Sequence, residues 1–391
     1  MRLLSLCGML AAGEYLASFV PGLTAAWPFV LVCAALVALF GYGLDVKGWR
    51  HTLILLFGVA LYLAASGKDE ARYRESPWMR GRDWRYRQQR TEPDGWAKDL
   101  KDDFSRRIGI GVENDRESAS LMRAILLGER GRMSFRTKRL FVESGTMHVF
   151  AISGLHVMAI ADVLTFALMC LMVPRRFAGL LSAPLLWGYV HLIGFSPSAV
   201  RAALMATFSL TAPLAWRRSD GLRSWSLTFL IVHLSNPLMI TNVGNVLSFA
   251  VMLAIVIVGE AVRNLPKWQR TLLVTMAAWA VGVPIAARVF GHVTPGGMLA
   301  NLILIGTVKL TVLAGAIGVA SSFVSNELAA HVNNLCALGI RAMVLVAEGV
   351  SRVPGGDIAV EKWSIFRCCA WCFSVIALVF VFSRIFRKHL L

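Results

Sequence analysis

Apolar runs close to twenty residues long recur along most of the chain and are separated by short polar turns. A helix of that length crosses the hydrocarbon core of a bilayer, whereas barrel strands would alternate polar and apolar residues in shorter segments. The pattern therefore predicts an all-α polytopic membrane protein with about eleven spans (ten to twelve) and additional amphipathic interfacial helices. The predicted spans are 3–20, 28–44, 51–66, 147–173, 177–195, 199–216, 224–241, 246–262, 271–290, 298–323 and 364–382.

One polar segment, residues 67–146, interrupts this series and is expected outside the membrane. In the last part of the chain, the amphipathic stretch 335–353 is expected to lie flat at the membrane surface, although a crossing would move the tail to the other side. The expected division is N-terminal transmembrane helices in 1–66, a short basic and aromatic extracytoplasmic segment in 67–117, a transmembrane domain in 118–323, and an interfacial helix with a last span in 324–391.

Composition and charge agree with a membrane protein. With 57% hydrophobic residues and a mean hydropathy of +0.62, the chain is too apolar for a soluble protein of 391 residues. Basic residues such as Lys47, Arg175 and Arg217 fall in alternate loops, which predicts a cytoplasmic N-terminus. The formal charge of +17 follows either from this rule alone or from contact with polyanions or anionic headgroups.

Residues 145–156 place His148, Ser153 and His156 inside the predicted span 147–173. Polar groups at this depth are costly, so they usually face a protein interior or a water-filled path. The predicted orientation puts Arg201 and Arg288, from two other spans, at a similar depth. Gly145 and Gly154, together with Ser153, fit a close helix crossing or a broken helix. The alternatives remain open, because each histidine can be a hydrogen-bonded core residue and each glycine a helix-packing residue.

Arginines and aromatic residues are interleaved in the polar segment before residue 90. Such a pattern suits either contact with the phosphates and bases of a single strand or a belt at the level of the lipid headgroups, and the belt is the favoured reading. The candidate phosphate or headgroup contacts are Arg72, Arg74, Trp78, Arg82, Trp84, Arg85 and Arg87.

Catalytic chemistry has little support in the sequence. Ser153, His156 and Asp162 include a nucleophile, a base and an acid, but on a continuous helix Asp162 projects about 120° away from His156. The chain has no His-Glu-x-x-His motif and no phosphate-binding loop, and the cysteines around Cys368 lack a second ligand pair. The sequence therefore predicts that the protein is not an enzyme and uses no metal or cofactor.

Five segments, in order, resemble the ComEC competence family of DNA-internalisation membrane proteins. They are 124–134, 141–157, 196–205, 236–249 and 284–301, and the resemblance covers about 117–323. It implies a channel for single-stranded DNA in the bacterial inner membrane during natural transformation. Its implied partners are DNA, the lipid bilayer, a separate DNA receptor, a motor ATPase and a nuclease. Combined with the predicted orientation, it gives a DNA path lined by His148, Ser153, Gly154, His156, Arg201, Arg288 and Asn301.

The chain departs from the family pattern at several points. Segment 67–117 is short and has no cysteine, so a full oligonucleotide-binding-type domain is not expected, and no His-x-His-x-Asp-His motif supports a nuclease domain. Gly306 stands where the family has a proline, and Lys309 has no counterpart in the family pattern. A transporter of lipid or another polyanion, or a vestigial or accessory subunit, is therefore the alternative function.

Overall fold

The computed structural model describes most of the chain from residue 95 onward. Predicted spans 28–44 and 51–66 and the candidate contacts Arg72, Arg74, Trp78, Arg82, Trp84, Arg85 and Arg87 lie outside the described residues. By internal contacts the chain divides into two units, Met1–Arg90 with Arg218–Phe249, and Thr91–Arg217 with Ala250–Leu391. The described residues are Cys7, 9–12, 95–150, 152–216, 219–289, 291–353, 356–364, 366–368, 370–371 and 374.

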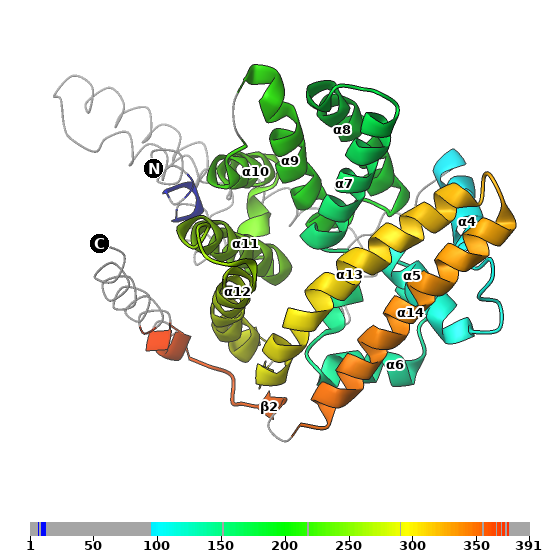
Figure 1. Cartoon of the computed structure of the whole chain (residues 1–391). Coiled ribbons are helices and arrows are strands. Elements are labelled where there is room, and N and C mark those ends of the chain that lie inside the picture. The colour runs from blue at the N-terminus through cyan, green and yellow to red at the C-terminus, as the bar shows by residue number, and fades with distance from the viewer. Residues whose placement is uncertain are drawn as a thin grey trace, which may run out of the picture. The chain divides into compact units, whose positions relative to one another are not determined.

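The described residues are almost entirely helical, which agrees with the all-α prediction (Figure 1). In the first unit, α10 (Gly221–Ser235) and the 3₁₀ turn η6 (Pro237–Thr241) precede α11 (Val243–Ala261), which continues into the second unit. The second unit contains α4 (Trp96–Arg107), α5 (Arg116–Leu126), η3 (Arg130–Arg132), α6 (Phe135–Glu143), η4 (Met147–Phe150), α7 (Gly154–Cys170), α8 (Arg175–Leu192), α9 (Pro197–Thr211), η5 (Ala212–Ala215), α12 (Lys267–Val289), α13 (Pro295–Ser321) and α14 (Asn326–Ser351).

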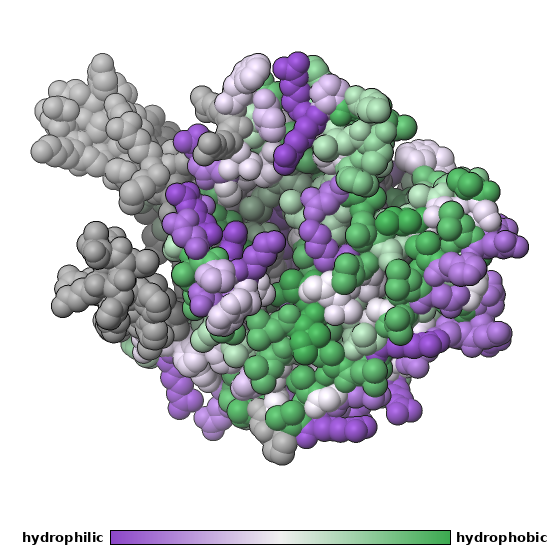
Figure 2. All heavy atoms as spheres, viewed as in Figure 1, coloured by the Kyte–Doolittle hydropathy of each residue, from purple (hydrophilic) through white to green (hydrophobic). Residues whose placement is uncertain are grey.

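Helices α11 to α14 are each long and apolar enough to cross a membrane. Their exposed apolar side chains include Leu310, Leu335 and Leu345, and Figure 2 shows apolar side chains over much of α13 and α14. These features are those of a membrane protein. Because α14 begins at Asn326 and packs along α13 after a tight turn, it extends well beyond the stretch 335–353 predicted to lie flat. Its length and composition favour the crossing alternative for this helix.

Helices α7, α8 and α9 form a bundle held by small and polar residues. Thr165 Oγ1 of α7 lies 3.0 Å from Ser182 Oγ of α8, and Trp187 Nε1 of α8 donates to Thr207 Oγ1 of α9 at 3.1 Å. Gly179 allows close approach, since a Cβ at that position would lie 2.5 Å from the Leu210 carbonyl oxygen. Small residues and interhelical hydrogen bonds are the usual means of packing helices where lipid offers no hydrophobic contrast.

The hairpin of α13 and α14 is tied to α4 by a buried amide. Asn333 Nδ2 donates to the Arg107 carbonyl at 2.9 Å and to the Ile110 carbonyl at 3.0 Å, and the Arg107 guanidinium donates to Ser322 Oγ at 3.0 Å. At the other end of α13, Gly145 lies against Thr294. Residues 107–145 therefore follow α13 from its C-terminal end to its N-terminal end.

Helix α4 and the first half of this segment also contact one end of the α7–α8 pair. The Trp96 ring lies 5.5 Å from the His191 ring near the end of α8, and Tyr189 donates to the Leu126 carbonyl at 2.9 Å. Ile152, just before α7, and Ile193, just after α8, share one core cluster, so the start of α7 and the end of α8 are adjacent. Helix α13 packs against α7, and its Lys309 reaches Asp162 in the middle of that helix.

Two short strands, which the sequence did not predict, join the turn before α13 to the segment after α14. Strand β1 (His292–Val293) pairs antiparallel with β2 (Ile358–Ala359). The Gly296 amide donates to the Gly356 carbonyl at 3.1 Å, and His292 Nδ1 lies 3.2 Å from Asp357 Oδ1. This link places residues 356–363 beside the end of α12.

Candidate functional site

The predicted span 147–173 is interrupted, and the candidate site lies at the interruption. A 3₁₀ turn, Met147–Phe150, is followed by a separate helix that begins at Gly154. Gly145 has a φ of 68°, a conformation that glycine adopts without steric cost, and Ser153 is extended at φ −101° and ψ 174°. Of the two arrangements that the sequence left open for this stretch, a close helix crossing and a broken helix, the structure has the broken helix, since Gly145 and Ser153 redirect the backbone.

Ser153 and His156 form the N-terminal cap of α7. His156 Nδ1 accepts the Ser153 backbone N–H at 3.2 Å and lies 3.0 Å from Ser153 Oγ. The His156 side chain is only 1% exposed. Since Nδ1 is an acceptor, the neutral ring carries its proton on Nε2, and Nε2 has no hydrogen-bond partner within the described part of the chain. A buried donor without a partner is costly and is often found at functional sites.

The same geometry lacks the third member of a catalytic triad. In a Ser-His-Asp triad the serine uses one ring nitrogen and a carboxylate orients the ring through the other. Here Ser153 meets Nδ1, and Asp162 forms an ion pair with Lys309 at 2.9 Å. Ser153 is therefore placed to cap a helix and position the imidazole.

His148 and Asn301, two of the predicted path residues, meet across η4 and α13. The His148 side chain makes a polar contact with the Asn301 side chain, and its Nδ1 lies 3.2 Å from the Gly145 carbonyl oxygen. His148 is exposed and Asn301 half-buried. This pair joins the turn before α7 to α13, and a second contact between the same two parts of the chain is the ion pair of Asp162 with Lys309.

Arg201 lies in the second turn of α9, which starts at Pro197, and its side chain is only 7% exposed. The next residue, Ala202, lies 3.8 Å from the Cβ position of Gly154. Ser198 Oγ also donates to the Ile152 carbonyl at 2.7 Å. These contacts place the first turns of α9, which include the buried Arg201, next to the start of α7.

Arg288 has a different environment from the other predicted path residues. It is exposed at the end of α12, and its guanidinium donates to the Trp363 carbonyl at 3.1 Å. It therefore belongs to the β1–β2 link. The structure brings together Ser153, Gly154 and His156, places Ala202 of α9 beside Gly154, and brings His148 and Asn301 into contact.

Arg130 was not singled out from the sequence. It lies in η3, and its Nε donates to the Phe150 carbonyl at 2.6 Å, at the end of the 3₁₀ turn. The bond holds a second arginine close to the break before α7. A lone arginine in a polar loop carries no periodic signal, so no sequence pattern distinguishes it from other surface arginines.

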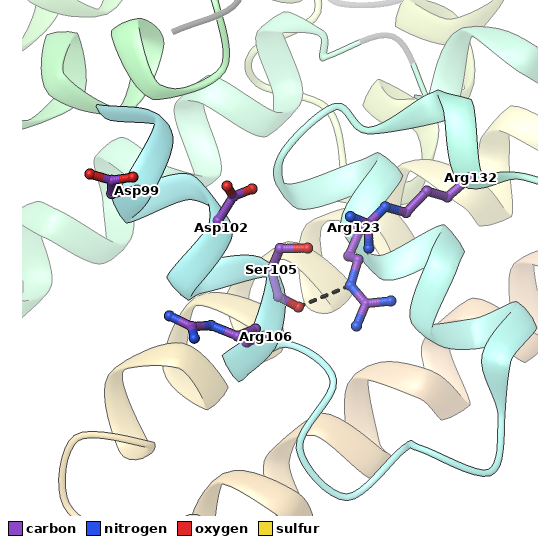
Figure 3. A pocket seen from close by; sticks show the side chains of 6 residues that line it. All are labelled: Asp99, Asp102, Ser105, Arg106, Arg123 and Arg132. Atoms are coloured by element: carbon purple, nitrogen blue, oxygen red, sulfur yellow. Dashed lines mark hydrogen bonds between the residues drawn. The ribbon is translucent and has the colours of Figure 1, made fainter. Parts of the chain in front are cut away.

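A polar pocket of about 650 Å³ lies among α4, α5 and η3, apart from the break. Figure 3 shows the Arg123 side chain pointing toward Ser105, whose carbonyl accepts from Arg123 Nε at 2.9 Å. Burial and the neighbouring charge of Arg132 lower the pKa of Arg123 from its usual value. Convergent guanidinium groups suit phosphate binding, but two acidic residues share this pocket. Its lining residues are Asp99, Asp102, Ser105, Arg106, Arg123 and Arg132.

Comparison with known proteins gives a match to the family model described as Competence protein over residues 125–385. ComE operon protein 3 of Bacillus subtilis (strain 168) is 26% identical over 202 residues, which are 51% of this chain and 26% of that protein. An uncharacterized protein of Aquifex aeolicus (strain VF5) is 25% identical over 226 residues, covering 57% of this chain and 50% of the relative. The uncharacterized protein YcaI of Escherichia coli (strain K12) is 25% identical over 275 residues, covering 64% and 35%.

The matched regions thus span between about a quarter and a half of the length of these curated relatives. No solved structure matches the chain.

Proposed function

This chain belongs to the competence protein family, and we propose on that premise that it acts in DNA uptake as a channel for single-stranded DNA. In this proposal it is a multi-pass protein of the bacterial inner membrane with a cytoplasmic N-terminus. The observation that carries the proposal is the interrupted span, where apolar helices place a buried imidazole at the cap of α7 and a buried guanidinium on the neighbouring α9.

A broken helix is a means of placing polar groups at membrane depth. Irregular backbone is tolerated there only where it is buried in protein or lines a cavity. The His156 Nε2–H group, with no hydrogen-bond partner in the described part of the chain, is available to a phosphate oxygen. Arg201 supplies a permanent positive charge on the adjoining helix, and the His148–Asn301 pair continues the polar groups toward α13.

The proposed role is transport without catalysis. The hydrogen bonds between Ser153 and His156 are those of a helix cap, so a catalytic role is not required to explain this contact. Driving force and strand processing then come from other proteins. We assign these tasks to a separate DNA receptor, a motor ATPase and a nuclease.

The direct test is deletion of the gene in a transformable host, with transformation frequency and entry of labelled DNA as the measurements. Deletion should abolish both, and the full-length gene should restore them. Arg201→Gln and His156→Ala should each lower DNA entry by about tenfold or more at normal membrane levels, as expected for the loss of a charge-assisted hydrogen bond. Unchanged transformation in the deletion strain would reject the proposal and favour transport of a lipid or another polyanion.

A second variant separates transport from catalysis. Asparagine caps helices about as well as serine but has no nucleophilic hydroxyl. Ser153→Asn should therefore keep DNA entry within about twofold of wild type. Complete loss of entry in Ser153→Asn, with the protein still present in the membrane, would support a reacting serine and contradict the assignment.

A further inference from the structure

Helices α7 and α13 each contain a single residue of the Asp, Glu, Lys and Arg classes, and those two residues pair with each other. Asp162 is the one in α7 and Lys309 the one in α13. Lys309 Nζ lies 2.9 Å from Asp162 Oδ2. Both side chains remain more than half exposed, at 54% for Lys309 and 58% for Asp162.

This ion pair lies on the same junction as the His148–Asn301 pair. Both contacts join the η4–α7 segment to α13, and Asn301 and Lys309 are eight residues, or about 12 Å, apart along α13. His148, Asp162 and Lys309 are exposed and Asn301 is half-buried. We call these four residues the polar junction.

The exposure of these charges decides what the polar junction faces. A charged side chain against hydrocarbon costs several kcal/mol, so charges on apolar helices face water or protein. The central part of a protein–protein interface is depleted of charged residues. The polar junction begins near the N-terminal end of the interrupted span. Its charged side chains therefore fit a surface that faces water better than an interface with a second copy of the chain.

We propose that the polar junction forms one wall of a water-filled path, and that Lys309 is a phosphate-contacting cation within it. Asp162 holds Lys309 in place when the path is empty, and a phosphate group replaces Asp162 as its partner during passage. The role of Lys309 rests on the proposed function, since it takes the backbone of single-stranded DNA as the polyanion. Water access to the polar junction does not depend on that function.

Water access is tested with single cysteines in the full-length protein, in a background whose native cysteines are replaced. Asp162→Cys and Lys309→Cys should react with a membrane-impermeant thiol reagent. Two exposed positions on other faces of the same helices serve as controls, Ala167 on α7 and Ile303 on α13, which lie about 140° and 120° around the helix. Ala167→Cys and Ile303→Cys should react at least about tenfold more slowly, because a thiol facing lipid ionises poorly.

The phosphate role is tested by uptake of labelled single-stranded DNA. Lys309→Gln should lower uptake by about tenfold, and Lys309→Arg should stay within about twofold of wild type. The double variant Asp162→Asn with Lys309→Gln separates contact from structure. A purely structural pair would recover uptake when both charges are removed, since no unpaired charge remains, whereas a phosphate contact would stay defective.

Two results would overturn the inference. One is labelling of Lys309→Cys no faster than Ile303→Cys, and the other is full uptake by the double variant. Neither would reject the proposed function, because wild-type DNA entry would be untouched. Conversely, a deletion strain that transforms normally would reject DNA as the substrate, and the labelling result would still report whether the polar junction meets water.

Discussion

At the residue scale, Asp115 links the start of α5 to α14. Its carboxylate accepts the Ser118 backbone N–H at 3.0 Å as the cap of α5 and pairs with the Arg341 guanidinium at 2.7 Å. Burial raises the pKa of Asp115, but the hydrogen bonds from Ser118 and Arg341 together hold that pKa below its usual value. The carboxylate thus stabilises the folded protein only while it is ionised.

We predict that Asp115→Asn lowers the free energy of unfolding by about 0.5 kcal/mol at neutral pH, because the cap is retained and the charge is lost. Asp115→Ala should cost about 1 to 2 kcal/mol, since it removes the cap as well. Because the pKa of Asp115 is lower in the folded protein, its carboxylate contributes its full stabilisation above the pKa of an unfolded aspartate, about 3.9. This stabilisation is lost as the pH falls through the pKa of Asp115 in the folded protein.

The measurement is thermal unfolding in detergent between pH 3 and pH 8. The stabilities of wild type and Asp115→Asn are compared, with Arg341→Gln as the matched control. The stability gap between wild type and Asp115→Asn should be constant above about pH 5 and should shrink below about pH 4. Arg341→Gln should show the same gap, and the double variant should add little to it. A gap that widens on acidification would contradict the assigned pair.

The sequence could select the residues of the site more easily than their partners. His148, His156 and Arg201 stand out because polar groups are rare in apolar runs. The pairing of Asp162 with Lys309 joins positions 147 residues apart, and no local pattern contains that information. Arg288 was grouped with the others by predicted depth alone. Its bond to the Trp363 carbonyl depends on the β1–β2 link, and strands of two residues are too short to be predicted from sequence.

At the scale of elements, close helix packing depends on Gly318 of α13. A Cβ at this position would collide with Asn333 Oδ1 of α14. Asn333 is fully buried, and its amide holds the Arg107 and Ile110 carbonyls at the end of α4. Displacing Asn333 would therefore disturb both the hairpin and the attachment of α4.

We predict that Gly318→Ala destabilises the protein by about 1 to 3 kcal/mol, the usual cost of overpacking a well-packed site. Gly306 is a matched control in the same helix, because nothing lies within 4 Å of its Cβ position. Gly306→Ala should be neutral or stabilising by up to about 1 kcal/mol, as expected from helix propensity. Unfolding in detergent, followed by circular dichroism, measures both. Equal effects of the two substitutions would contradict the packing argument.

Apolar periodicity predicted the bounds of some elements well and left the start of α7 open for a physical reason. The predicted spans 246–262, 271–290 and 298–323 correspond to α11, α12 and α13 within a few residues, because polar residues and prolines end those runs. Hydropathy alone does not locate the break before α7, because the side chains from Met147 to Ile152 are apolar except His148 while the backbone changes direction. Hydropathy reports side chains only, and the signs of the break were Gly145 and Ser153.

At the scale of the whole molecule, the position of α13 limits where the polar segment lies. Residues 107–145 follow α13 from end to end, and Leu126 of this segment accepts from Tyr189 near the end of α8. Trp96, in the helix that precedes the segment, lies beside His191 at the same end of α8. If α7 and α8 cross the bilayer, both ends of the segment lie toward the same membrane surface. Helix α13 is then strongly tilted, although its length would allow a direct crossing.

We therefore predict that the two ends of this segment are reached from the same side of the membrane. Lys98 of α4 and Arg136 of α6 are both exposed and lie near those ends. In a background without native cysteines, Lys98→Cys and Arg136→Cys should both react with an impermeant thiol reagent added outside intact spheroplasts, and neither should need permeabilisation. This outcome agrees with an extracytoplasmic polar segment and a tilted α13. A different result, labelling of one position from outside and of the other only after permeabilisation, would contradict the prediction. It would show that α13 crosses the membrane directly and that residues 107–145 cross beside it.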